Sequence, residues 1–122
     1  MPEYQVLFYE KVNGDVPAEE YINSLEDKMS AKVYRLLTML SQNGVDLREP
    51  YSKHLEDGIF ELRAQIGSNL SRVLYFFIMG QRIIVTNGFT KKTQKTPRSE
   101  IEKAKLYRKD HLRREELGDE NT

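Results

Sequence analysis

Three lysines lie close together in the stretch GFTKKTQKTP (residues 88–97), between an apolar run and a proline: Lys91, Lys92 and Lys95. Crowded ammonium groups can bind phosphate oxygens, and because neighbouring cations disfavour the charged form, one of them could also act as a base. The sequence does not say which one, and for Lys95 phosphate binding alone is an equal alternative. The other interpretation is a solvated loop, which most short charged runs form.

Two arginines lie in segments whose patterns predict β-strands. Arg63 belongs to IFELRAQI, which alternates between two faces, and Arg72 interrupts the apolar run LSRVLYFFIM. A guanidinium is planar, always charged and able to bind phosphate through two hydrogen bonds. The turn signal GSN joins the two segments, so the arginines could lie side by side, although strand register decides whether they share a face. The alternative for Arg63 is an ion pair with an acid, whereas burying an unpaired charge is costly and favours a function or a specific partner for Arg72.

The elements that must position these cations begin with a strand and two helices. An alternating segment predicts a strand over residues 4–9. Asp15 is expected to cap the first helix, with Pro17 in its first turn, and Ser30 to cap a second helix that ends near Gly44. Two helices in tandem predict an N-terminal helical hairpin. Val33, Leu36, Leu37 and Leu40 make one apolar stripe along the second helix.

The second half of the chain predicts a meander of three strands, from IFELRAQI, LSRVLYFFIM and RIIVTNGF, followed by a helix. Thr96 is expected to cap that helix, with Pro97 at its first position. The predicted fold class is α+β, in the order β-α-α-β-β-β-α, with a small sheet rich in antiparallel pairs and a C-terminal helix. We expect one domain over residues 1–114 and an acidic, frayed tail over residues 115–122.

The charge is balanced overall but unevenly distributed. The 122 residues include 19 Lys or Arg and 19 Asp or Glu, yet residues 81–109 hold nine basic residues against two acidic ones. Residues 1–30 hold two basic residues against seven acidic ones. A basic segment of this kind is typical of a phosphate-binding surface, unless folding brings acidic segments beside it.

The composition also indicates a compartment. The chain has no cysteine, which excludes disulfides and thiolate metal sites and fits a reducing environment. The N-terminus MPEYQVLFYE lacks the basic start and apolar centre of a signal peptide, and no apolar stretch approaches the roughly 20 residues that span a bilayer. We therefore expect a soluble cytoplasmic protein.

The order of elements, the strand text FELR, the strand SRVLYFF and above all NGFTKKTQKTPRSEIEKAK together resemble the HigB-type toxins of the RelE/ParE superfamily. These are bacterial and phage proteins of type II toxin–antitoxin systems. The resemblance covers nearly the whole chain and implies a RelE-like fold and an endoribonuclease that cleaves messenger RNA on the ribosome. It also implies a helix-turn-helix antitoxin, HigA-like, as partner. Several relatives carry histidine where this chain has Asn87, so a histidine acid or base is absent at that position.

The cationic residues fit the chemistry that the resemblance implies. Metal-free RNA cleavage requires a base for the 2′-hydroxyl, stabilisation of the charged transition state and a proton for the 5′-oxygen. Arg63 and Arg72 suit the second task, and Lys91 and Lys92 could supply the others. These four residues are the predicted catalytic set. No metal or other cofactor is expected, since the chain has only two histidines and no cysteine, and no acids cluster around the cationic residues.

A second set of residues could bind the RNA: Lys53, His54, Tyr75 and Lys95. Lys53 and His54 precede the meander in YSKHLEDG, where a lone histidine is more often structural than catalytic. Tyr75 could stack on a base or pack in the core, and core packing is the favoured role for Phe76 and Phe77. Two other functions remain open: a ParE-like inhibitor of DNA gyrase, and a nucleic-acid-binding relic without toxicity. A shared fold does not decide between them.

Overall fold

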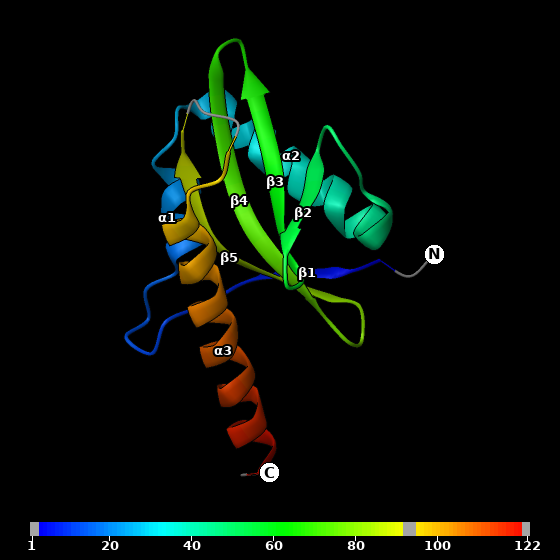
Figure 1. Ribbon diagram of the computed structural model, residues 1–122, viewed down its shortest axis with the longest axis vertical. Helices are drawn as coiled ribbons and strands as arrows, with labels where there is room; N and C mark the ends of the chain where they lie inside the picture. Colours follow the sequence, from blue (N-terminus) through cyan, green and yellow to red (C-terminus); the bar gives the residue numbers. More distant parts are fainter. Residues whose placement is uncertain (1–2, 92–94, 121–122) are drawn as a thin grey trace.

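The chain forms a five-stranded sheet with helices on both faces, as the computed structural model describes for residues 3–91 and 95–120 (Figure 1). The elements in chain order are β1 (Gln5–Phe8), α1 (Pro17–Asn23), α2 (Asp27–Asn43), the short 3-10 helix η1 (Gly44–Asp46), β2 (Ser52–Glu56), β3 (Ile59–Ile66), β4 (Asn69–Ile78), β5 (Arg82–Thr90) and α3 (Arg98–Glu120). The predicted α+β class is confirmed.

The strand β2 is the element that the sequence did not predict. Its residues SKHLE are mostly polar and lack a regular alternation, so the local pattern indicates a loop. In the fold, β2 pairs antiparallel with β3, with Ser52 opposite Leu62 and Lys53 opposite Glu61. The predicted order β-α-α-β-β-β-α is therefore wrong by one strand, because the pairing partner, and not the segment itself, makes β2 a strand.

The predicted meander of β3, β4 and β5 is confirmed and forms the centre of the sheet. The strands lie in the order β1-β5-β4-β3-β2, and β1 pairs with β5 in parallel. Parallel neighbours cannot be joined by a tight turn, and here the first two helices and three strands lie between them in the chain.

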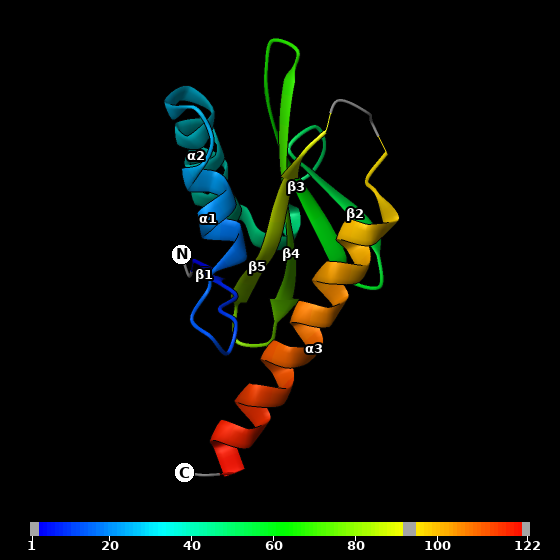
Figure 2. The same ribbon diagram turned by 90° about the vertical axis from the view of Figure 1, so that its left-hand side faces the viewer.

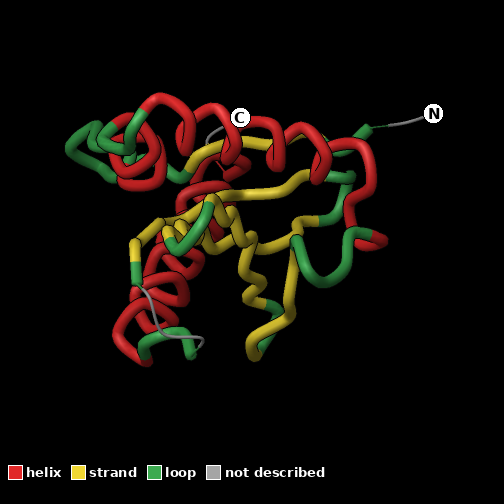
Figure 3. The backbone as a smooth tube through the Cα atoms, turned by 90° about the horizontal axis from the view of Figure 1, so that it is seen from above, coloured by secondary structure: helices red, strands yellow, loops and turns green. Residues whose placement is uncertain are grey.

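The two faces of the sheet are covered by different helices. α1 and α2 lie against one face and α3 against the other, so the sheet is the middle of three layers (Figures 2 and 3). Because successive side chains of a strand point to opposite faces, each strand supplies residues to both cores. The core on the α1–α2 face includes Met29, Val33, Leu36, Leu37, Leu40, Leu62, Val73, Tyr75, Ile83 and Val85. The core on the α3 face includes Tyr9, Ile59, Leu74, Phe76, Ile84, Phe89 and Ala104.

The starts of the first two helices differ from the predicted ones. α1 has Val16 rather than Asp15 at its N-cap, and α2 has Glu26 rather than Ser30. The Glu20 carboxylate accepts a hydrogen bond from the Val16 N–H at 2.8 Å, which satisfies a donor at the start of α1. The tandem helices themselves are as predicted.

The end of α2 agrees with the prediction, whereas both ends of α3 differ from it. Gly44 ends α2 with φ of 52°, as predicted. α3 begins at Arg98, so Thr96 lies too far upstream to cap it, and it continues to Glu120, so most of the segment expected to fray is helical. Its C-terminal half extends beyond the sheet (Figure 1).

Among the described residues, no helix combines the length and apolar character that crossing a bilayer requires.

Gly88 is the point where α1 comes closest to β5. A Cβ at this position would lie 2.2 Å from Cδ2 of Tyr21, whose hydroxyl is 2.6 Å from the Thr90 hydroxyl. Gly88→Ala should therefore displace the Tyr21 ring and lower the free energy of unfolding by about 1–3 kcal/mol, measured by urea denaturation. Gly118→Ala is the control, since a Cβ there meets no atom within 4 Å among the described residues. Equal stability of the two variants would contradict this close approach.

Candidate active site

Arg63 and Arg72 are direct partners across the β3–β4 pair. The register places them on the face of the sheet that α3 covers, the same face as Ile59 and Leu74. The sequence left this register open, and the structure brings the two arginines together.

Glu61 is the residue that joins them. Its Oε1 lies 3.0 Å from Nε of Arg63, and its Oε2 lies 3.7 Å from Nη1 of Arg72. The Thr96 hydroxyl donates a hydrogen bond to Oε2. The side chains of Glu61 and Arg72 are 1% and 0% exposed, and that of Arg63 is 20% exposed. A carboxylate and a guanidinium removed from water in this way stabilise one another, because either alone would be strongly unfavourable.

Glu61, the centre of the site, is not among the residues predicted from the sequence. The signal was present, because alternation puts Glu61 and Arg63 on one face of the same strand. Recognising it also required the register with β4 and the return of the chain to Thr96, which no local pattern contains. Thr96 is bonded to the sheet through Glu61 and does not cap α3.

Arg72 is oriented by its surroundings. Burial lowers the pKa of its guanidinium, the Glu61 carboxylate raises it, and the neighbouring Arg63 lowers it. Cζ of Arg72 lies 5.8 Å from the centre of the Phe89 ring, a cation–π contact. Because Arg72 is enclosed, Arg63 is the arginine of the pair that solvent reaches.

A cleft of about 340 Å³ opens beside Glu61, between β2, β3 and the start of α3. Lys53 and Lys95 line it together with Thr96, and the register places Lys53 directly opposite Glu61. Lys91 is exposed at the end of β5. Lys92 lies outside the described residues. Cations predicted from separate segments of the sequence, Arg63, Arg72, Lys53 and Lys95, therefore meet around one buried carboxylate.

Tyr75 does not belong to this cleft. Its ring is 1% exposed and stacks on Phe60 at 5.5 Å in the core that faces α1 and α2. Its hydroxyl is 2.5 Å from that of Ser52, and burial raises its pKa although the Ser52 hydrogen bond lowers it. Of the two roles that the sequence left open for Tyr75, core packing is the one that the structure shows, and a contact with RNA stays a prediction. Phe76 and Phe77 pack in the cores, as favoured.

His54 borders the cleft in a structural position. Its Nε2 accepts a hydrogen bond from the Gly58 N–H at 3.2 Å, and its ring meets that of Phe60 edge-on at 4.9 Å. Both contacts fix the turn between β2 and β3. A direct contact between His54 and RNA stays a prediction.

Asn87 also has a structural role. It is buried, and its Nδ2 donates hydrogen bonds to the Glu100 side chain at 3.0 Å and to the Glu100 carbonyl at 3.3 Å. These bonds tie β5 to the first turn of α3.

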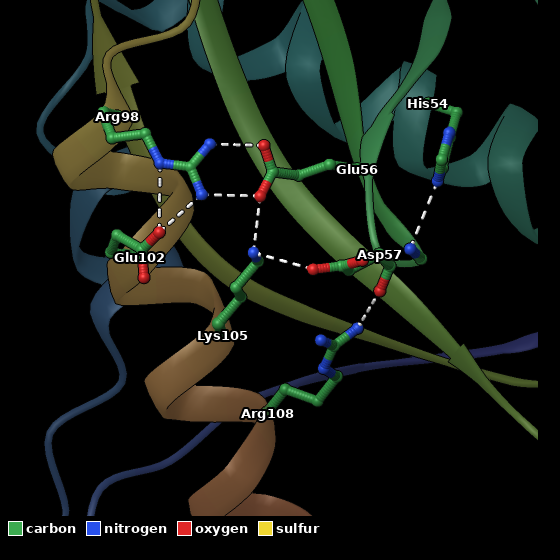
Figure 4. A network of polar contacts seen from close by, with 8 residues as sticks. His54, Glu56, Asp57, Arg98, Glu102, Lys105 and Arg108 are labelled. Carbon is green, nitrogen blue, oxygen red and sulfur yellow. Dashed lines mark hydrogen bonds and ion pairs between the residues drawn. The ribbon is translucent and has the colours of Figure 1, made fainter.

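An ion-pair network connects the turn between β2 and β3 to α3 (Figure 4). Glu56 binds both Arg98 and Lys105, and Lys105 lies 2.9 Å from Asp57. Arg108 donates a hydrogen bond to the carbonyl of Asp57. Since Glu56 and Arg98 also line the cleft, the network holds its two walls together.

The remaining acids are dispersed. Within residues 3–91 and 95–120, no group of three His, Asp or Glu side chains could hold a metal ion.

Comparison with known proteins places most of this chain in one family. The model of the family described as "Phage derived protein Gp49-like (DUF891)" matches residues 20–109, which include the whole candidate site. No curated protein matches the chain.

The Glu61 cluster predicts a large loss of stability on a small change. Glu61→Gln leaves Arg72 buried without its countercharge, so the free energy of unfolding should fall by about 3–5 kcal/mol in urea denaturation. Glu102→Gln is the matched control, because Glu102 is 55% exposed and pairs with Arg98 on the helix surface. Its effect should be far smaller. Similar losses in both variants would show that Glu61 is no more important than a surface carboxylate.

The network of Figure 4 predicts an acid titration. Hydrogen bonds from Arg98 and Lys105 lower the pKa of Glu56 from 4.5 to about 2. Its contribution to stability is therefore complete above pH 4.5 and is lost as the pH falls through about 2. The Glu56 carboxyl should titrate near pH 2 by NMR, and Arg98→Ala should raise the midpoint.

Lys103→Ala is the control for this titration, since Lys103 pairs with Glu100 and not with Glu56. A Glu56 midpoint that does not respond to Arg98→Ala would contradict the network.

Proposed function

Because the chain belongs to the Gp49-like family of phage-derived proteins, which is associated with toxins of toxin–antitoxin systems, we propose that it is such a toxin and an endoribonuclease. The observation that carries the proposal is the set of cations around Glu61. Arg63 and Arg72 oppose each other across two strands, and Lys53 and Lys95 line the adjoining cleft. The Glu56–Arg98 ion pair that also lines the cleft is neutral, so these four cations outnumber the Glu61 carboxylate and give the site a net positive charge suited to RNA phosphates.

The finer assignment is to HigB-type toxins with a RelE-like fold. It rests on the resemblance of residues 87–105, together with the meander and the C-terminal helix. The substrate we propose is messenger RNA on the ribosome, in the cytoplasm.

The reaction we propose is attack of a 2′-hydroxyl on the neighbouring phosphate. The 2′-oxygen forms a bond to phosphorus while the bond to the 5′-oxygen breaks, leaving a cyclic phosphate and a 5′-hydroxyl. A base takes the proton of the 2′-hydroxyl, and an acid gives one to the 5′-oxygen. Lys91, Lys92 and Lys95 are the candidates for these two transfers, and their assignment stays open.

The arginines would stabilise the charge that develops on the phosphate. Arg63 is the partly exposed member of the pair and would contact the phosphate oxygens directly. Glu61 pairs with Arg63 through Nε, so the two terminal nitrogens of the guanidinium would be the ones to contact phosphate. Arg72 would act as a second, enclosed positive charge behind it.

The partner we propose is a helix-turn-helix antitoxin. Two surfaces suit it: the cationic cleft, and the acidic segment of residues 1–30 that includes α1. A neighbouring gene for a helix-turn-helix protein of about one hundred residues would support this assignment.

Expression of the chain alone in bacteria should stop growth and deplete full-length messenger RNA. In a translating extract, Arg63→Ala should slow cleavage by about 10²–10³-fold, because a positioned donor to the transition state is lost. Arg63→Lys keeps the positive charge but loses the planar guanidinium, which can donate two hydrogen bonds to one phosphate, so it should restore only part of the rate. Primer extension on the message measures both the rate and the cut sites.

The control is Arg35→Ala, since Arg35 is exposed on α2, on the opposite side of the sheet. Cleavage that persists in Arg63→Ala would remove this site from the mechanism. Intact messenger RNA together with blocked DNA supercoiling would replace the proposal by a gyrase inhibitor.

A further inference from the structure

A second pocket, of about 220 Å³, opens along β3 just beyond the point where its pairing with β2 ends. It is lined by Lys32, Pro50, Tyr51, Arg63, Gln65 and Leu70. Nothing in the proposed reaction uses this pocket, apart from Arg63.

The pocket has an open aromatic wall. Tyr51 is 42% exposed, so part of its ring surface is open to solvent. Its backbone is held on both sides, since its carbonyl accepts the Arg63 N–H at 2.8 Å and its N–H donates to the Arg48 carbonyl at 3.0 Å. The ring is therefore presented from a fixed backbone, with Pro50 and Leu70 as further apolar walls.

The polar lining suits the edge of a nucleobase. Gln65 carries an amide with both donors and an acceptor, and its Nε2 donates to the Gly67 carbonyl at 3.2 Å. Lys32 donates from Nζ to the Gln65 carbonyl at 2.5 Å and adds a positive charge at the rim. Binding sites for single-stranded RNA combine an aromatic ring on which a base stacks, polar groups that hydrogen-bond the edge of the base, and a cation that contacts the phosphate backbone.

Arg63 connects this pocket to the active site. It lines the pocket, and its Nε lies 3.0 Å from Oε1 of Glu61, which lines the larger cleft. A phosphate bound at Arg63 would therefore have its attached nucleoside within reach of Tyr51.

We propose that the pocket formed by Tyr51, Gln65 and Arg63 binds one nucleobase of single-stranded RNA, next to the phosphate that is cleaved. The proposal rests on the proposed function and adds a base-binding subsite to it. Stacking on Tyr51 supplies affinity, and the Gln65 amide supplies preference among the bases.

Fluorescence anisotropy with a labelled oligoribonucleotide, made resistant to cleavage by 2′-O-methyl groups, tests the subsite. Tyr51→Ala should weaken binding by about 5- to 150-fold, the usual effect of losing one stacked base. Tyr51→Phe keeps the ring and should bind as the unchanged protein does. Tyr51→Leu keeps apolar bulk without an aromatic face and should bind nearly as weakly as Tyr51→Ala.

Tyr34→Ala is the matched control, since Tyr34 is 39% exposed and lies on α2, away from both pockets. A second control replaces the bases of the oligonucleotide by abasic sites. Without bases to stack, the unchanged protein and Tyr51→Ala should bind with equal affinity, because the phosphate contacts are the same in both.

The outcomes separate the subsite from the proposed function. If the unchanged protein cleaves messenger RNA and binds the oligonucleotide, but Tyr51→Ala and Tyr51→Leu bind as well as Tyr34→Ala, the subsite is overturned and the toxin assignment stands. If the unchanged protein neither binds nor cleaves RNA, both fall. A Tyr51→Ala defect that persists with the abasic oligonucleotide would also overturn the subsite, since it would not arise from a base.

Discussion

The buried ion cluster of Glu61, Arg63 and Arg72 is the constraint on which the rest of this structure depends. Removing a carboxylate and a guanidinium from water costs several kcal/mol for each group, and only close mutual contact offsets that cost. The cluster therefore requires one particular register of β3 on β4, because a slip of one residue would send Arg72 to the core behind α2 while Glu61 stayed on the α3 face. In this way a polar interaction, and not only apolar packing, specifies how the two central strands pair.

The same cluster binds Thr96, at the far end of the segment that carries the lysines. At one end of that segment, the Thr90 hydroxyl contacts the Tyr21 hydroxyl of α1 at 2.6 Å. At the other end, Thr96 is bonded to Glu61, two residues before α3 begins. The chain therefore leaves β5 and enters α3 at points held by polar contacts on opposite layers of the fold. Lys91 and Lys95 lie next to these two points, and their side chains are exposed.

The tertiary structure also changes how the basic segment should be understood. Nine basic residues against two acidic ones over residues 81–109 suggested a broad cationic surface. Several of these cations form ion pairs with acids from other parts of the chain: Arg82 with Glu115, Arg98 with Glu56, and Lys105 with Glu56 and Asp57. The cationic character is thereby concentrated around Glu61, which Arg63 contacts and beside which Lys53 and Lys95 line the cleft. A compact positive site suits recognition of one phosphate better than a broad field, which attracts nucleic acid without selecting a position on it.

The sequence by itself determined the α+β class, the tandem helices, the central meander, the stripe from Val33 to Leu40 and the cationic residues, because each has a local signal: a period, a turn or a side-chain type. It could not determine β2, which is a strand because it pairs with β3. It also could not determine the burial of Tyr75, because the hydroxyl that bonds the Tyr75 hydroxyl belongs to Ser52 on that unpredicted strand. Only the tertiary structure decided that Glu61 lies between Arg63 and Arg72. That arrangement depends on the register between β3 and β4, and on the later part of the chain returning to bring Thr96 to Glu61. Opposite charges far apart in the sequence stabilise one another only when the folded chain brings them within a few ångströms. No local sequence pattern predicts that distance.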